Sequence, residues 1–283
     1  MRRIDHLVIA VRNLDQAADV YRKLGFQVGT RNRHPWETEN RLIQFESSFI
    51  ELITVGAGAQ VMPHQPRQFS FGAFIQNFLE KREGIAMMVL SSEDARADAA
   101  LFREQGIGDF EPFWFSRKGV RPDGSEVQVA FTLAFAHAPL APDLSFFVCQ
   151  QHYPENFWNR QFQRHSNTAT NIVEVTLAGD DPKRHQHFLT AFSGAVPHHR
   201  PDGGMAFRLD DGHIQIVPSL AQNRSHSSTR LTSLAVRVAD LESAKRLIRR
   251  EGLQFMDSNE YVVIAPNLLN GVELRLATPT KHL

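Results

Sequence analysis

The stretch that decides the fold is IDHLVIAVRNLDQAADVYRKLGFQV, residues 4–28 of a chain of 283 residues. It opens with a mostly apolar run that predicts a strand over 4–11. Apolar residues then recur every three or four positions over 14–24, which predicts an amphipathic helix. Gly25 follows this helix, where a glycine commonly ends a helix in the left-handed conformation. Strand, helix and glycine together predict the first part of a βα unit.

The same order of elements recurs three more times, and each copy continues with three shorter strands after its helix. The later copies begin with IAMMVL at 85–90, IVEVTL at 172–177 and SLAVRV at 233–238. In the second copy we expect Ser92 to cap the helix. The repeat predicts an α+β protein of four βαβββ modules, in which the strands form curved sheets and each helix covers an outer face.

Two interruptions of the repeat indicate the domain organisation. Residues 56–83 separate the first two copies and include an additional predicted helix over 69–83. Residues 153–170 are polar and lack periodicity, which is typical of an inter-domain linker. We therefore expect two cup-like domains of paired modules, an N-terminal domain over 1–160 and a C-terminal domain over 171–283. The chain length is also that of about two domains.

Composition and charge exclude several classes of function. The chain has 31 basic and 31 acidic residues, so it lacks the net positive charge that nucleic acids and anionic membranes attract. No stretch reaches the ~20 apolar residues of a membrane span, and the apolar run near the N-terminus is too short for a signal peptide. The single cysteine, Cys149, suits a reducing compartment. We expect a cytoplasmic protein that binds a small molecule, with a homo-oligomer left open.

The opening segment and the strand FIELITV resemble the vicinal oxygen chelate superfamily, which includes glyoxalase I, bleomycin and fosfomycin resistance proteins, and extradiol dioxygenases. The segments RHPWETENRLIQF and FFVCQQHYPENFWN are similar to its glyoxalase-like domain group. In that superfamily the first and fourth strands of two modules hold one divalent metal ion. The resemblance implies His6 and Glu51 as ligands, while the second module has Ala86 in place of the histidine and no carboxylate on its fourth strand.

The residues themselves support a site at His6 and Glu51. A histidine alone in an apolar strand is most often a hydrogen-bonded core residue. A carboxylate between two apolar residues is costly to bury unless it is paired or coordinated, and Glu51 has such neighbours. The pair therefore favours one divalent ion, and it suits Zn, Mn, Ni or Fe(II) without selecting among them. Glu51 is also the expected catalytic residue, because it can move a proton.

A third metal ligand is expected beside this pair. Strand alternation puts Gln150 and His152 on one face of the strand SFFVCQQ, which we expect to face the cup. His152 is the first choice, against a strand-end histidine bonded to Glu155, and His34 is the other candidate. The residues expected to bind substrate are His34, Trp36, Asn40, Arg41 and Gln150.

The second cup is expected to hold no metal. Its four positions equivalent to the ligands are Val173, with Glu174 as the alternative, then Gln215, Ser233 and Glu273. A single carboxylate cannot hold a transition metal in competition with water. We expect a structural role for this half, with partner binding as the alternative.

Two classes of function stay open. The first, implied by the resemblance, is a metal-dependent lyase or isomerase that acts on a small carbonyl or vicinal-oxygen substrate. Ring-cleaving oxygenation is a variant of it that requires two histidines and one carboxylate on Fe(II). The second is a protein that sequesters an aromatic, drug-like molecule in the cup, with or without a metal. The first class is preferred, and the ligands that the second module lacks keep the second class open.

Overall fold

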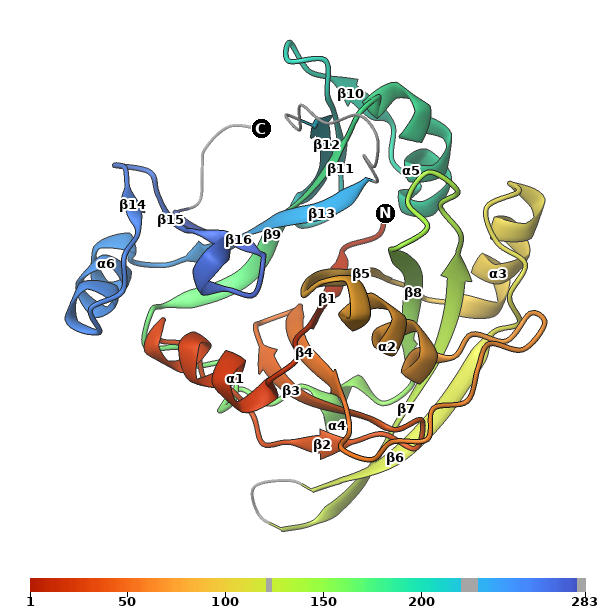
Figure 1. The fold of residues 1–283 in the computed structure, drawn as a ribbon, viewed down its shortest axis with the longest axis horizontal. Coiled ribbons are helices and arrows are strands. Elements are labelled where there is room, and N and C mark those ends of the chain that lie inside the picture. Colours follow the sequence, from red (N-terminus) through yellow and green to blue (C-terminus); the bar gives the residue numbers. More distant parts are fainter. Residues whose placement is uncertain (121–123, 220–228, 279–283) are drawn as a thin grey trace.

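The computed structural model describes residues 1–120, 124–219 and 229–278, and within them sixteen strands form one curved sheet with helices packed against it (Figure 1). This arrangement confirms the predicted α+β class. No helix in the described ranges combines the length and the apolar character of a membrane span.

The first module shows the pairing that organises the whole sheet. Its first strand, β1 (Ile4–Ala10), pairs in parallel with its last strand, β4 (Phe49–Val55). Beyond β4 the sheet continues antiparallel through β3 (Thr38–Gln44) and β2 (Asn32–Arg33). The helix α1 (Leu14–Lys23) contacts β3 and β4, and its buried residues face them.

The same parallel pairing joins β5 to β8, β9 to β12 and β13 to β16. The second unit comprises β5 (Gly84–Ser91), α3 (Ala95–Glu104), β6 (Phe113–Val120), β7 (Glu126–Ala136) and β8 (Ser145–Gln151). The third comprises β9 (Ala169–Gly179), a 3-10 turn (Pro182–His185), α5 (Gln186–Ser193), β10 (Pro197–His199), β11 (Met205–Arg208) and β12 (His213–Pro218). The fourth comprises β13 (Arg230–Val238), α6 (Leu241–Arg250), β14 (Met256–Asp257), β15 (Tyr261–Ile264), a 3-10 turn (Pro266–Leu268) and β16 (Glu273–Ala277).

Side-chain caps fix where the helices begin. Asn13 caps α1 by accepting a hydrogen bond from the backbone N–H of Gln16. The expected cap of α3 was wrong by two residues, because Asp94 rather than Ser92 accepts from the first N–H groups of the helix. Ser92 instead donates its hydroxyl proton to Asp98 in the first turn. An aspartate satisfies the free N–H groups of a helix start as well as a serine does, and it adds a favourable charge.

The modules join in pairs and the pairs join each other. β1 runs antiparallel to β5, and β9 runs antiparallel to β13. A single pair, Leu231 with Ile85, connects β13 to β5. The segment over 153–170, predicted as a linker, includes the short helix α4 (Pro154–Phe157) and packs on the first module through His165, whose Nε2 lies 2.8 Å from the carbonyl oxygen of Gln44. The division into domains over 1–160 and 171–283 stays a prediction.

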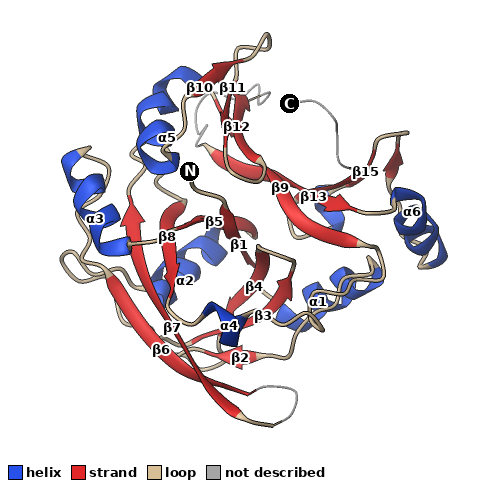
Figure 2. Ribbon diagram, turned by 180° about the vertical axis from the view of Figure 1, so that it is seen from behind, coloured by secondary structure: helices blue, strands red, loops and turns tan. Residues whose placement is uncertain are grey.

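Aromatic packing also connects the two halves. Phe146 of β8 is fully buried, and its ring lies 4.9 Å from that of Phe188 and 5.6 Å from that of Phe192, both on α5. Phe192 also contacts Phe102 of α3. A helix of the third module thus covers a strand and a helix of the second (Figure 2).

The additional helix expected over 69–83 forms α2 (Phe71–Lys81), which contacts β4.

Replacing Phe146 with alanine tests this packing. The variant should lose about 3–5 kcal/mol in its free energy of unfolding. Removal of the ring leaves a cavity between β8 and α5, and these elements cannot move enough to fill it. Chemical denaturation measures the loss. Leu101→Ala is the control, since that side chain on α3 is 39% exposed and its loss should change the free energy by no more than about 0.5 kcal/mol. Equal effects of the two substitutions would contradict the packing described.

Candidate functional site

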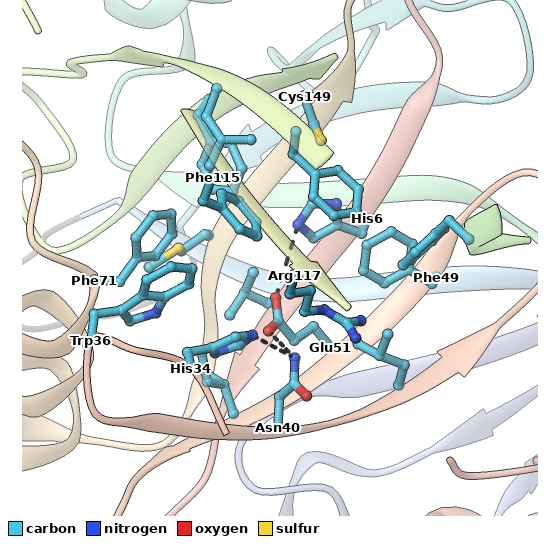
Figure 3. Close-up of a pocket in the computed structure, with 18 residues that line it drawn as sticks. His6, His34, Trp36, Asn40, Phe49, Glu51, Phe71, Phe115, Arg117 and Cys149 are labelled. Atoms are coloured by element: carbon cyan, nitrogen blue, oxygen red, sulfur yellow. Dashed lines mark hydrogen bonds and ion pairs between the residues drawn. The ribbon is translucent and has the colours of Figure 1, made fainter. Parts of the chain in front are cut away.

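A pocket lies between the strands of the first and second modules (Figure 3). Its walls are mostly aromatic. The aromatic side chains that line it are Trp36, Phe49, Phe71, Phe115, Phe131, Phe147 and Phe157. Its polar side chains are His6, His34, Asn40, Glu51 and Arg117. Apolar walls with a few convergent polar groups are typical of sites for small molecules.

Strand alternation brings His6 and Glu51 to the same face. In the parallel pairing of β1 with β4, His6 lies opposite Phe49 and Val8 lies opposite Glu51. All four side chains line the pocket, and the imidazole of His6 stacks on the ring of Phe49 with 4.2 Å between centroids. His6 Nε2 lies 4.0 Å from Glu51 Oε2. The two residues that the sequence singled out therefore meet in the pocket.

A buried aspartate orients His6 from behind. Asp5 has no exposed surface, and its Oδ1 lies 2.6 Å from His6 Nδ1. Its other oxygen accepts a hydrogen bond of 2.9 Å from the side-chain amide of Gln151 on β8. Because a carboxylate accepts, the shared proton belongs to Nδ1, and the second ring nitrogen is left facing Glu51.

The carboxylate of Glu51 is held on its other side by Asn40. Asn40 Nδ2 donates a hydrogen bond of 2.6 Å to Glu51 Oε1 and lies 3.3 Å from His34 Nε2. His34 stacks on Trp36, with 4.7 Å between the ring centroids. Burial lowers the pKa of His34, although the charge of Glu51 opposes the shift. His34 is therefore neutral at pH 7 and adds no charge to the pocket.

Arg117 is the site residue that the sequence analysis missed. It lies on β6 opposite Val129, and its side chain points into the pocket beside Glu51 (Figure 3). Burial lowers the pKa of Arg117, while the charge of Glu51 opposes this. The signal was present in the strand FWFSRKGV, because Phe115 also lines the pocket and Arg117 follows it at the strand period of two.

Two of the expected residues lie on the other face of β8. Gln150 accepts a hydrogen bond from the backbone of Ala95 at the start of α3, and it donates to the carbonyl of Glu93. His152 Nε2 lies 2.7 Å from the hydroxyl of Thr132, not against Glu155. The expectation that Gln150 and His152 face the cup was therefore wrong. The alternation was right but its phase was not, because Phe147 and Cys149 are the residues of β8 that line the pocket.

Arg41 is also outside the pocket. It follows Asn40 on β3 and so points to the opposite face, where its guanidinium lies 2.8 Å from Asp15 and donates to the carbonyl of Gly29. This placement contradicts its expected role at the substrate mouth. His34, Trp36 and Asn40, from the same segment, do line the pocket.

The divalent ion implied by the resemblance does not fit the donor set of this pocket. Within the described ranges, no three side chains of His, Cys, Asp or Glu converge on one point. His6 and Glu51 are the two that would bind an ion. The candidate third ligand His34 also lines the pocket, as does Cys149 of the second module, but neither completes a group of three, and His34 Nε2 contacts Asn40 instead. Ala86, expected at the ligand position, does not line the pocket. Arg117 already places a positive charge beside Glu51, which disfavours a second cation there.

The strand pairing in the second cup shows which of its residues match His6 and Glu51. On β9 and β12, His213 lies opposite Glu174 and Gln215 opposite Thr176, so Glu174, not Val173, matches His6. On β13 and β16, Ser233 pairs with Glu273 and Ala235 pairs with Arg275. By comparison with the first module, the position of Glu51 is taken by Arg275, and the expected match of Glu273 was wrong by two residues.

The polar side chains of the second cup bind one another. Glu174 lies 3.1 Å from His213 Nε2, 3.6 Å from Arg275, and accepts a hydrogen bond of 2.6 Å from Gln215. Burial acts to raise the pKa of Glu174, but the hydrogen bond from His213 and the nearby charges lower it below its usual value. These contacts suit a structural role. That this half binds no metal stays a prediction.

Solved structures with the same fold include proteins of several activities. A hypothetical protein from Staphylococcus aureus is 13% identical with a TM-score of 0.69, over 99% of this chain and 100% of its own. The Mn(II)-bound glyoxalase from Novosphingobium aromaticivorans is 11% identical with a TM-score of 0.63, over 98% of this chain and 83% of its own. A mutant of 4-hydroxymandelate synthase from Streptomyces coelicolor is 9% identical with a TM-score of 0.61, over 99% and 94%. At such identities the likeness shows the fold alone.

Sequence comparison places the chain in a family. Among curated proteins, no sequence gives a significant match. The sequence profile of the glyoxalase-like domain, however, matches residues 4–193, which is more than half of the chain and includes every polar residue of the pocket. The fold agrees with that match. The chain belongs to the glyoxalase-like domain family.

Proposed function

We propose that the chain is an enzyme, a lyase or isomerase that transfers a proton on a small carbonyl compound with an aromatic part. The observation that carries the proposal is the separation of 4.0 Å between His6 Nε2 and Glu51 Oε2 in an aromatic pocket. A carboxylate and an imidazole at this distance can face the same substrate atom or two adjacent ones. Such a pair is suited to general acid–base catalysis.

Glu51 is the base in this proposal. Asn40 holds its Oε1, so Oε2 faces His6 and the pocket. The carboxylate takes a proton from the carbon next to the substrate carbonyl. The C–H bond breaks, the proton goes to Oε2, and the electron pair moves to the carbonyl oxygen as an enolate. Return of the proton to the same carbon reverses the step. With an α-hydroxy carbonyl substrate, delivery of the proton to the former carbonyl carbon, together with transfer of the hydroxyl proton to the former carbonyl oxygen, completes an isomerisation without net oxidation.

His6 moves the second proton. Asp5 fixes the tautomer with its proton on Nδ1, which leaves Nε2 as an acceptor toward the pocket. Phe49 stacks on the ring and limits its rotation. An imidazole fixed in this way can take the proton from a substrate hydroxyl while Glu51 acts on carbon, and then give that proton to the former carbonyl oxygen. The aromatic walls bind the apolar part of the substrate and exclude water.

This proton transfer is proposed to take place without the divalent ion that the resemblance implies. A Mn(II)-bound glyoxalase has the same fold, but likeness at 11% identity does not carry its metal to this chain. The side chains offer His6 and Glu51 where a transition metal usually has at least three protein ligands. Each step above is therefore assigned to the protein's own groups.

A binding protein without catalysis is the second candidate. The aromatic walls favour it, because they would sequester an aromatic molecule whether or not the polar end reacts. In this alternative His6 and Glu51 bind the ligand's polar atoms. Hydrogen exchange distinguishes the two functions.

Acetophenone in D2O tests proton transfer, since its methyl hydrogens lie next to a carbonyl and its ring suits the pocket. The wild type should exchange them faster than buffer does, as followed by loss of the methyl signal in proton NMR. Glu51→Gln should slow this exchange by about 10²-fold or more, because the base is lost. Glu39→Gln is the control, as Glu39 pairs with Arg31 outside the pocket. Binding of acetophenone without exchange by the wild type would favour the second candidate.

Elemental analysis tests the metal-free assignment. Protein purified without added metal or chelator should contain well below one divalent ion per chain, because two ligands do not retain a transition metal through purification. The double variant His6→Ala, Glu51→Ala should contain the same amount. One ion per wild-type chain that disappears in the double variant would contradict the assignment and restore His6 and Glu51 as ligands.

A further inference from the structure

Arg117 carries a charge that the proposed proton transfer does not use. Its side chain is partly buried and points into the pocket (Figure 3). It makes no hydrogen bond and no ion pair with any residue in the described ranges. Two other partly buried arginines are paired, Arg2 with Asp98 at 2.7 Å and Arg237 with Asp211 at 2.7 Å. Arg82, outside the pocket, has an Nη2 without a hydrogen-bond partner among the described residues, but its guanidinium lies over the ring of Phe78 at 4.6 Å.

Glu51 does not satisfy this charge. Its carboxylate interacts with Arg117 at a distance, but the two side chains do not approach to within ion-pair contact, and Asn40 binds Glu51 instead. The other polar groups around the pocket, His6 and His34, offer Arg117 no negative charge. A guanidinium withdrawn from water without a partner is costly, and an anionic ligand offsets that cost.

We propose that Arg117 binds the carboxylate of the ligand, so that this pocket selects aromatic carboxylates. The guanidinium presents two parallel N–H donors that match the two oxygens of a carboxylate. The aromatic side chains Phe115 and Phe131 line the pocket with it and supply the surface for a ring. This assignment names the class of substrate. It rests on the proposed function only because it assumes that the substrate binds in the same pocket.

The same charge gives the ligand a direction. A carboxylate bound at Arg117 puts one end of the molecule at β6, whereas His6 lies on β1 and Glu51 on β4 of the first module. Repulsion from Glu51 keeps the carboxylate from binding at the acid–base pair. The reacting part of the molecule is thereby left for His6 and Glu51.

Benzoate and benzamide form a matched pair of probes, because they share the ring and the planar shape but differ in charge. Calorimetric titration at pH 7 of the wild type should give a Kd for benzoate lower than that for benzamide by about tenfold or more, as expected for one charge-assisted contact. Arg117→Gln should abolish this preference and leave the Kd of benzamide unchanged. Arg117→Lys should keep part of the preference for benzoate. Lysine retains the positive charge but lacks the two parallel N–H donors of the guanidinium.

Lys118→Gln is the matched control, since Lys118 is the adjacent cation on β6, is 79% exposed and pairs with Glu126. It should keep the full preference for benzoate. Benzamide binding by Arg117→Gln shows that its pocket is folded, and the wild-type preference tests the proposal even if that variant does not fold.

The outcomes separate the two proposals. Equal affinity of the wild type for benzoate and benzamide overturns the role of Arg117 while leaving an aromatic pocket. A preference that survives Arg117→Gln overturns it as well. Binding of neither probe overturns both the assignment of Arg117 and the aromatic substrate class. If only the acetophenone exchange fails, the proposed proton transfer is overturned, and the assignment of Arg117 as a carboxylate-binding residue is unaffected.

Discussion

The parallel pairing of β1 with β4 sets His6 opposite Phe49 and Val8 opposite Glu51, and the pocket depends on this register. Side chains alternate along a strand, so a slip of one residue in either strand would turn His6 or Glu51 toward the helix-covered face. The apolar residues between them, such as Leu7 and Ile50, are fully buried there. Burial of those residues therefore fixes the register, and the register positions the polar pair.

The two cups show how similar side chains come to differ in availability. In the second cup Glu174 is surrounded by His213, Gln215 and Arg275, which bind both of its oxygens. In the first cup Asn40 donates to one oxygen of Glu51, and the other faces His6 at 4.0 Å. A carboxylate whose partners are all supplied by the protein stabilises the fold. One with an oxygen left toward a pocket can act on a ligand.

The fold and the pocket residues of the first module could be predicted from the sequence for a definite physical reason. The repeat, the helices and the pair of His6 and Glu51 depend on local periodicity, which the chain shows directly. The phase of β8 could not be found that way, because SFFVCQQ is apolar on both faces, with Phe146 beneath the helices and Phe147 in the pocket. Charge alone did not single out Arg117 either, since Lys118 beside it is an ordinary exposed cation.

The hydrogen bond from Gln151 to Asp5 constrains how the repeats of this chain can diverge. Gln151 ends the last strand of the second module, whereas Asp5 and His6 belong to the first strand of the first module. Among its described residues the second module presents no ligand-type carboxylate to the pocket, yet through this contact it holds the aspartate that orients His6. Substitutions inside the second module are therefore free to reshape the walls around a new ligand, while position 151 is held to a side chain that donates to Asp5. Selection for a different ligand would accordingly act on the second module first, with His6 and Glu51 kept unchanged.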